Sequence, residues 1–116
     1  MRPVPPLGSG GFVRSHEAPE FSIVVPAFNA EQTVTGAIES VREQTRADWE
    51  LIVVDDGSAD ATRAAADAIA ATDARVRVVS QANAGSAAAR NRGAAEGRSE
   101  LLVFFDADDA HDAGYL

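Results

Sequence analysis

The sequence predicts an α/β fold with a mainly parallel sheet, and two observations lead to this prediction. Short runs rich in Val, Ile, Leu and Phe recur at residues 21–25, 49–54, 76–79 and 101–105. The segments between these runs carry either the apolar spacing or the high alanine content of helices. Strands that alternate with helices form βαβ units, so we expect the Rossmann-like order β-α-β-α-β-α-β.

The first strand is predicted at Phe21–Val25 and ends at Pro26, which has no backbone donor. Asn29 is expected to cap the next helix, with Gln32 three residues further on. One apolar face of this helix is predicted from the spacing of Val34, Ala37, Ile38 and Val41. The helix pattern ends near residues 44–45.

The second strand is predicted at Trp49–Val54, followed by a turn over Asp55–Ser58. Ser58 or Asp60 is expected to cap an alanine-rich helix over roughly residues 61–72. A third strand follows at Val76–Val79, and a loop spans residues 81–85.

A third helix is predicted over Ser86–Glu96, with Gly97 in the left-handed conformation after its end. The fourth strand, Leu101–Phe105, has five apolar residues in a row, so we expect it to be buried on both faces. It leads directly into Asp106-Ala107-Asp108-Asp109.

Composition excludes several classes of function. The 116 residues include 18 acidic and 10 basic ones, for a net charge of −8, so we expect no nucleic-acid partner. The chain has neither Lys nor Cys, which rules out a lysine Schiff base, a thiol nucleophile and a Cys-ligated zinc. No apolar run is long enough for a membrane segment, and a cytoplasmic location is expected. Residues 1–19, rich in Pro and Gly, are interpreted as a disordered leader, and residues 20–116 as one domain.

Polar side chains follow three of the predicted strands: Asn29, then Asp55 with Asp56, then Asp106 with Asp108. The carboxyl ends of parallel strands share one edge of the sheet, where α/β proteins bind ligands. Carboxylates favour Mg²⁺ or Mn²⁺, and such an ion would neutralise a diphosphate. Taken singly, each position also has a plainer reading, since acids suit turns, helix caps and solvated loops.

Four motifs in order resemble those of family 2 glycosyltransferases with the GT-A fold. They are residues 23–29 (IVVPAFN), residues 51–62 (LIVVDDGSADAT), Asn83-Ala84-Gly85 with Ala89-Arg90-Asn91, and residues 105–109 (FDADD). The resemblance implies transfer of a sugar from a nucleotide-diphospho-sugar to an acceptor hydroxyl with inversion, and the donor it implies is a UDP-sugar.

The resemblance also implies roles for individual residues. Pro26, Ala27, Phe28 and Asn29 would line the base and ribose pocket, with Glu31 nearby, and Phe28 stands where the family usually has Tyr. Asp56 would contact the base, Asp55 would support the turn, and Gly85 and Arg90 would lie on the donor side. Asp106 would contact the ribose or the metal, and Asp108 would be the principal ligand of Mn²⁺ or Mg²⁺.

The family's acceptor site and general base follow this metal motif, so the base is expected beyond Leu116. We therefore expect residues 20–116 to be the donor-binding part of an incomplete domain, with little transfer activity alone. The acceptor class (glycan, lipid or protein) and any membrane association of the full-length protein are left open by the sequence.

Two alternatives come from the same residues. A haloacid-dehalogenase-like phosphatase would use Asp106 as nucleophile and Asp108 as acid/base, but would leave the Asp55–Ser58 motif without a role. A non-catalytic nucleotide-binding fragment would use the same pocket without transferring a sugar.

Overall fold

The computed structural model describes residues 19–44, 48–99 and 101–105. Strands and helices alternate along the chain as predicted from the sequence. The elements are β1 (Phe21–Ala27), α1 (Val34–Arg42), β2 (Trp49–Asp55), α2 (Thr62–Ala70), β3 (Val76–Ser80), α3 (Ser86–Glu96) and β4 (Leu102–Phe104). The expected leader at residues 1–19 lies, except for Pro19, outside the described residues.

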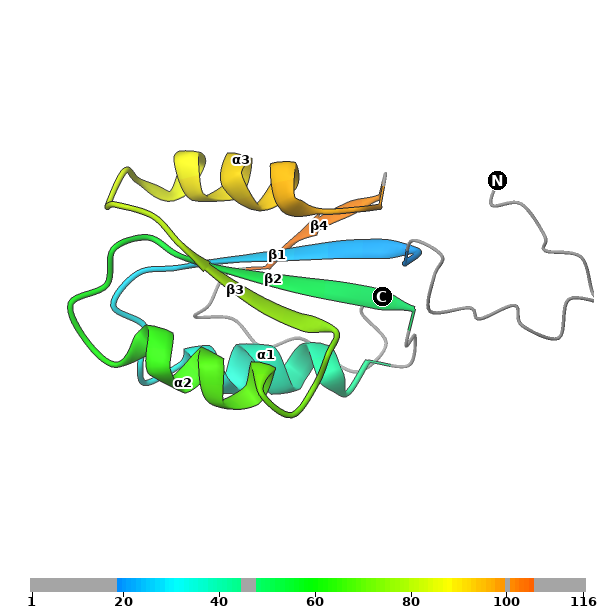
Figure 1. The fold of residues 1–116 in the computed structure, drawn as a ribbon, viewed down its shortest axis with the longest axis horizontal. Helices are drawn as coiled ribbons and strands as arrows, with labels where there is room; N and C mark the ends of the chain where they lie inside the picture. Colours follow the sequence, from blue (N-terminus) through cyan, green and yellow to red (C-terminus); the bar gives the residue numbers. More distant parts are fainter. Residues whose placement is uncertain (1–18, 45–47, 100, 106–116) are drawn as a thin grey trace, which may run out of the picture.

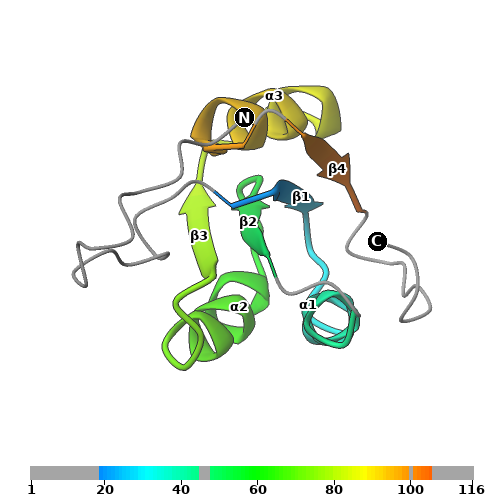
Figure 2. The same ribbon diagram turned by 90° about the vertical axis from the view of Figure 1, so that its right-hand side faces the viewer.

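The strands form one parallel sheet in the order β3-β2-β1-β4. β1 and β2 are paired over their whole length, from Phe21 opposite Trp49 to Ala27 opposite Asp55. Helices α1 and α2 cover one face of this sheet and α3 covers the other (Figures 1 and 2). The loops that follow β1, β2 and β3 therefore meet at the carboxyl edge, at the left of Figure 1.

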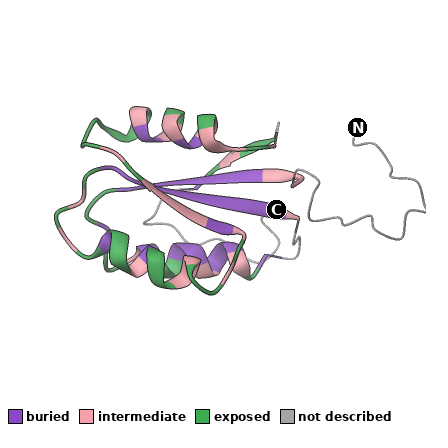
Figure 3. Ribbon diagram, viewed as in Figure 1, coloured by how far each residue is buried: buried purple, intermediate pink, exposed green. Residues whose placement is uncertain are grey.

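Each face of the sheet has its own core. Successive side chains of a strand point to opposite faces, so Ile23 and Val25 pack toward α1 while Val24 packs toward α3. The predicted apolar face of α1 is confirmed, since Val34, Ala37, Ile38 and Val41 are all buried. Figure 3 shows the two central strands almost entirely buried: β2 is buried along its whole length and β1 everywhere except at its first residue, Phe21.

The core beneath α3 depends on small residues. A Cβ atom on Gly93 would lie 2.2 Å from Cγ1 of Val24, so only glycine allows the helix to approach β1 this closely. Gly97 was expected to be left-handed, and this prediction is wrong, because its φ is −72° and its ψ is 145°. Its Cβ would lie 2.9 Å from the side chain of Ser22, so close contact with β1 explains this glycine as well.

The start of α1 also differs from the prediction. The helix begins at Val34, with Thr33 as its N-cap, rather than after Asn29. Asn29 instead adopts a positive φ of 49° and uses its side chain to hold a neighbouring loop. The N-cap of α2 is Ala61, so the expected cap at Ser58 or Asp60 is wrong. Asp60 still accepts a hydrogen bond from the Thr62 backbone N–H at 2.9 Å, and Ser58 accepts one from the Asn29 backbone N–H.

The expectation that the fourth strand is buried on both faces is wrong. Leu101, Leu102 and Phe104 expose between 40% and 50% of their surface. β4 lies at one side of the described sheet and pairs only with residues 22–24 of β1 (Figure 2). Phe104 is the partner of Val24, on the face where α3 buries only Ala89 and Gly93, and these residues are too small to reach over the outer strand.

Within the described ranges, no helix combines the length and the apolar character that crossing a membrane requires.

The packing of α3 on β1 can be tested with a pair of glycine substitutions. Gly93→Ala should lower the free energy of unfolding by ~1–3 kcal/mol, because the new methyl group overlaps Val24. Gly36→Ala in α1 is the matched control: a Cβ there meets nothing within 4 Å, so it should raise stability by ~0.5–1 kcal/mol. Urea unfolding of both variants measures the difference, and equal effects would contradict the close approach.

Candidate functional site

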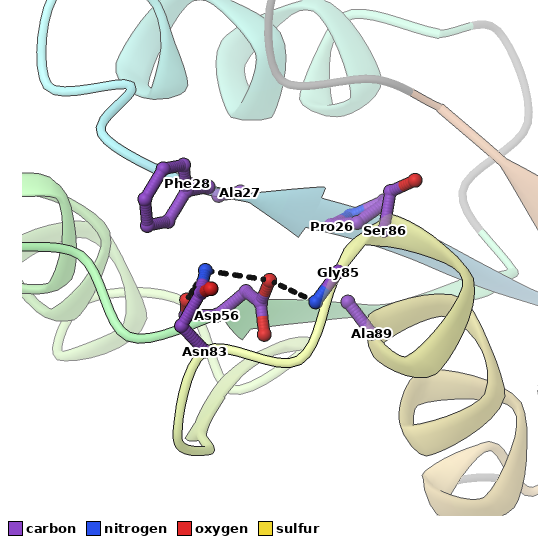
Figure 4. Close-up of a pocket in the computed structure, with 8 residues that line it drawn as sticks. All are labelled: Pro26, Ala27, Phe28, Asp56, Asn83, Gly85, Ser86 and Ala89. Atoms are coloured by element: carbon purple, nitrogen blue, oxygen red, sulfur yellow. Dashed lines mark hydrogen bonds between the residues drawn. The ribbon is translucent and has the colours of Figure 1, made fainter.

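The carboxyl edge of the sheet contains a hollow of about 230 Å³ (Figure 4). It is formed by the end of β1, the residue after β2, the loop after β3 and the first turn of α3. The lining residues are Pro26, Ala27, Phe28, Asp56, Asn83, Gly85, Ser86 and Ala89. Segments that are far apart in the sequence thus come together where parallel sheets bind ligands.

Asp56 is the charged group of this hollow, and it is almost entirely buried, with 3% of its surface exposed. Its Oδ1 accepts hydrogen bonds from Gln81 Nε2 and the Ala84 backbone N–H, both at 2.9 Å. Its Oδ2 accepts from Asn83 Nδ2 at 3.2 Å and from the Gly85 N–H at 2.9 Å. The carboxylate therefore holds the loop after β3 in place.

These donors also determine the charge state of Asp56. The Gln81 amide, together with the backbone N–H groups of Ala84 and Gly85, lowers the pKa of Asp56 below its ordinary value of 3.8. Burial acts in the opposite direction, but the hydrogen bonds outweigh it. Asp56 is therefore ionised at neutral pH.

Asn83 is held in one orientation by Asp56. Its Nδ2 donates to the Asp56 backbone carbonyl at 3.0 Å as well as to the carboxylate. These two bonds fix the orientation of the Asn83 amide. No described residue donates a hydrogen bond to its Oδ1. The backbone beside it requires glycine: a Cβ on Gly57, whose φ is 77°, would lie 2.6 Å from the Asn83 nitrogen.

Phe28 forms the opposite side of the hollow and leaves 51% of its surface exposed (Figure 4). It follows Ala27, whose carbonyl accepts the Asp56 N–H at 2.9 Å. Pro26 fits into β1 because its missing N–H faces the β4 side, where the described pairing ends at Val24. A large aromatic ring is thus presented beside a buried carboxylate.

Two other residues predicted for the site, Asn29 and Glu31, do not line the hollow. Asn29 Oδ1 accepts from the Ala59 N–H at 2.9 Å. Glu31 Oε1 accepts from the Ala61 N–H, and the Glu31 N–H donates to Asp60, both at 3.3 Å. These bonds join the loop after β1 to the loop after β2. They therefore fix the backbone of the loop after β1, which begins with Phe28.

Asp55 is not a lining residue of the hollow, and its carboxylate accepts hydrogen bonds from two neighbouring residues. Its Oδ1 accepts from the Ser58 N–H at 3.2 Å and its Oδ2 from the Ser80 hydroxyl at 3.4 Å. Arg90 follows Ala89 in α3 but is not a lining residue, and it has no ion pair with any residue that the structure describes.

The predicted metal ligands Asp106 and Asp108 lie outside the described residues. In the described ranges, no three His, Cys, Asp or Glu side chains are grouped so that they could hold a metal ion. The Phe105 N–H donates to the carbonyl of Val24, in the middle of β1, at 3.0 Å.

Three lining residues were not among the site residues predicted from the sequence: Asn83, Ser86 and Ala89. Asn83 and Ala89 belong to the third motif of the family resemblance, but the resemblance gave neither of them a role in the site. Ser86 and Ala89 carry a weaker signal, namely that a helix begins immediately after Gly85, with its N-terminus at the ligand-binding edge.

Comparison with known proteins identifies the family. The family model described as "Glycosyl transferase family 2" matches residues 22–116. The chain belongs to this family, and its alternating strands and helices are those of the GT-A fold.

The relatives include two bacterial glycosyltransferases. The chain is 39% identical over 99 residues to the putative glycosyltransferase EpsH of Bacillus subtilis, covering 85% of this chain and 29% of EpsH. It is also 39% identical over 96 residues to the Escherichia coli beta-1,3-glucosyltransferase WfgD, whose donor is named as UDP-Glc, covering 82% of this chain and 37% of WfgD. The chain thus spans only about a third of the length of these relatives.

Solved structures agree with this assignment. TarS of S. aureus (residues 1–349) in complex with UDP superposes with a TM-score of 0.75 at 26% identity, covering 82% of this chain and 29% of that one. The mannosyltransferase PcManGT of Pyrobaculum calidifontis, in complex with GDP-Man and Mn²⁺, gives 0.74 at 26% identity, with coverages of 81% and 29%. The comparisons do not favour the phosphatase alternative.

The role of Asp56 in holding the loop is testable by hydrogen exchange. Asp56→Asn replaces an acceptor oxygen with an NH₂ group that faces other donors, so the Ala84 and Gly85 amides should exchange at least ~10-fold faster. Asp67→Asn, an exposed aspartate of α2, is the matched control and should leave both rates unchanged. NMR-detected exchange measures the rates.

The same measurement has a pH dependence. Folding lowers the pKa of Asp56 below 3.8, so the ionised carboxylate stabilises the loop above that pH and the stabilisation is lost as the pH falls through the native pKa. In the wild type, the protection of the Ala84 and Gly85 amides from hydrogen exchange should therefore fall as the pH is lowered through this pKa. In Asp56→Asn it should not change with pH in this range. The same pH dependence of exchange in both proteins would contradict the role of Asp56 in holding the loop after β3.

Proposed function

We propose that residues 20–116 bind the donor of a glycosyltransferase reaction, a nucleotide-diphospho-sugar of the UDP type. The observation that carries this proposal is that Phe28 after β1 and Asp56 after β2 line the same hollow, together with the loop after β3. A uracil base needs an aromatic surface and hydrogen-bond acceptors, and this hollow offers both. The structure of TarS in complex with UDP supports a donor of this class.

Each lining group has a distinct part in this proposal. The half-exposed ring of Phe28 stacks on the base, a contact worth ~1–3 kcal/mol. Asn83 Oδ1 accepts the imide N–H, because its amide is already oriented by Asp56. Each Asp56 oxygen accepts two hydrogen bonds, so Asp56 contacts the base only if one of its present donors gives way.

The size of the hollow fits part of the donor. At about 230 Å³ it is smaller than the ~300–1,000 Å³ of sites that enclose a complete drug-sized ligand. It therefore suits the base and ribose, and the diphosphate must be bound by groups outside it.

We assign the diphosphate to a divalent cation bound by Asp106 and Asp108. Both offer only carboxylate oxygens, which Mn²⁺ and Mg²⁺ accept. The residue before Asp106, Phe105, is hydrogen-bonded to Val24 of β1, the strand whose end lines the hollow. When bound, the ion stabilises the negative charge of the departing diphosphate. The structure of PcManGT in complex with GDP-Man and Mn²⁺ supports the use of a divalent cation.

Transfer to an acceptor hydroxyl with inversion requires a general base, which we assign to the longer protein, beyond Leu116. The relatives are about three times as long as the stretch matched here, which leaves room for that base and for an acceptor site. The acceptor, a glycan, lipid or protein, is therefore a property of that region.

Titration calorimetry with UDP tests the donor site. Wild-type chain should bind UDP in the presence of Mn²⁺, and Phe28→Ala should weaken binding at least ~5-fold through loss of stacking. Phe104→Ala is the matched control, because Phe104 is similarly exposed but lies on β4 away from the hollow. Equal affinities for Phe28→Ala and wild type would contradict the proposed base site.

Removal of the metal ligands gives an independent test. The double variant Asp106→Asn/Asp108→Asn should abolish the Mn²⁺ dependence of UDP affinity while leaving the metal-free affinity unchanged. Asp112→Asn, an acid just after the motif, should behave as wild type. Calorimetry with and without EDTA provides the measurement, and a Mn²⁺ dependence that survives in the double variant would reject these ligands.

A further inference from the structure

A second hollow lies at the opposite edge of the sheet, where β2 and β3 begin and α3 has ended. Its volume is about 340 Å³, and it is lined by Glu50, Ala74, Arg75, Arg77 and Arg98. None of these residues belongs to the nucleotide site described above. The two hollows are separated by the length of the strands.

The charge of this second hollow is opposite to that of the chain. Three of the ten arginines line it, against one carboxylate, in a protein whose net charge is −8. Glu96 and Asp73 flank it and pair with Arg77 and Arg75. The lining itself therefore carries an excess of two positive charges.

Glu50 does not occupy the hollow as a free anion. Its side chain is 3% exposed, and it accepts hydrogen bonds from the Ser22 hydroxyl at 2.6 Å and from the Arg98 backbone N–H at 2.5 Å. Burial raises the pKa of Glu50, but these bonds outweigh it and the pKa is lowered. The ionised carboxylate thus holds the Arg98 guanidinium, at 3.1 Å from its Nε, and the Arg77 guanidinium at 3.4 Å.

The other arginines are also fixed. Asp73 holds Arg75 through two hydrogen bonds of 3.0 and 2.9 Å, and the guanidinium lies 3.9 Å above the ring of Trp49. Arg77 donates to the Glu96 carbonyl at 2.7 Å. Little side-chain entropy would be lost on binding a ligand here.

Several donors of these guanidinium groups have no acceptor among the described residues. Arg98 uses only Nε, so Nη1 and Nη2 are free, and its side chain is 61% exposed. Arg75 likewise uses Nε and Nη2 but not Nη1. Fixed, planar guanidinium groups with free N–H donors are the arrangement that recognises phosphate oxygens.

We propose that this arginine hollow is a phosphate-binding site, separate from the nucleotide site. Its ligand is a phosphate monoester or diester group, presented either by a soluble phosphorylated compound or by the headgroup of an anionic phospholipid. Arg98 contributes the direct contacts, while Glu50 and Asp73 position the guanidinium groups.

The only tryptophan of the chain reports on this site, because Arg75 lies over its ring. Adding inorganic phosphate at constant ionic strength should change Trp49 fluorescence with a saturable dependence. Arg98→Gln should weaken the apparent affinity for phosphate about tenfold. Arg98→Lys keeps the charge but loses the paired N–H donors of the guanidinium, so its affinity should lie between those of the wild type and Arg98→Gln. Arg63→Gln on α2, an exposed and ion-paired arginine, is the matched control and should behave as wild type.

A second arm identifies the source of the phosphate. Sedimentation with vesicles of phosphatidylglycerol and phosphatidylcholine, compared with phosphatidylcholine alone, supports a lipid headgroup if binding needs the anionic lipid and is lost in Arg98→Gln. Phosphate binding without vesicle binding supports a soluble ligand. A fluorescence change that does not saturate, or that is the same in Arg98→Gln as in wild type, overturns the proposal, provided that circular dichroism shows Arg98→Gln to be folded.

Discussion

The buried carboxylate of Asp56 is the interaction on which the proposed nucleotide site depends. It stands at the end of β2 and accepts four hydrogen bonds from the loop between β3 and α3. A buried charge is tolerated only when it is paired or fully hydrogen-bonded, so the loop and the carboxylate require each other. The first turn of α3, and with it Ser86 and Ala89, follows from the position of that loop.

A second set of bonds fixes the other side of the site. Asn29 and Glu31 join the loop after β1 to the loop after β2, and the Ala30 N–H donates to the buried Thr62 hydroxyl at 2.7 Å. These are contacts between backbone and side chain across about thirty residues of sequence. These bonds fix the backbone of the loop that carries Phe28, while the Phe28 ring remains exposed. A fixed, exposed ring suits a residue that we propose to stack on a ligand.

The two edges of the sheet use buried acids in different ways. At the carboxyl edge, Asp56 organises neutral donors, and at the amino edge, Glu50 organises arginines. The neutral donors around Asp56 add no positive charge to the first hollow, whereas the arginines around Glu50 retain unused N–H groups in the second. One protein can therefore offer two hollows of opposite electrostatic character without any lysine.

The sequence by itself determined the order of strands and helices, the apolar face of α1 and the family of the protein. These properties are encoded locally, in spacing and in short motifs such as Asp55–Ser58. Only the tertiary structure decided that Asn29 and Glu31 join two loops, that Gly97 is needed for close packing, and that β4 is exposed. Each of these properties depends on which segment, distant in the sequence, packs against the residue concerned. The same holds for Asn83, whose amide is oriented by a carboxylate 27 residues earlier in the chain, a distance across which no local pattern extends.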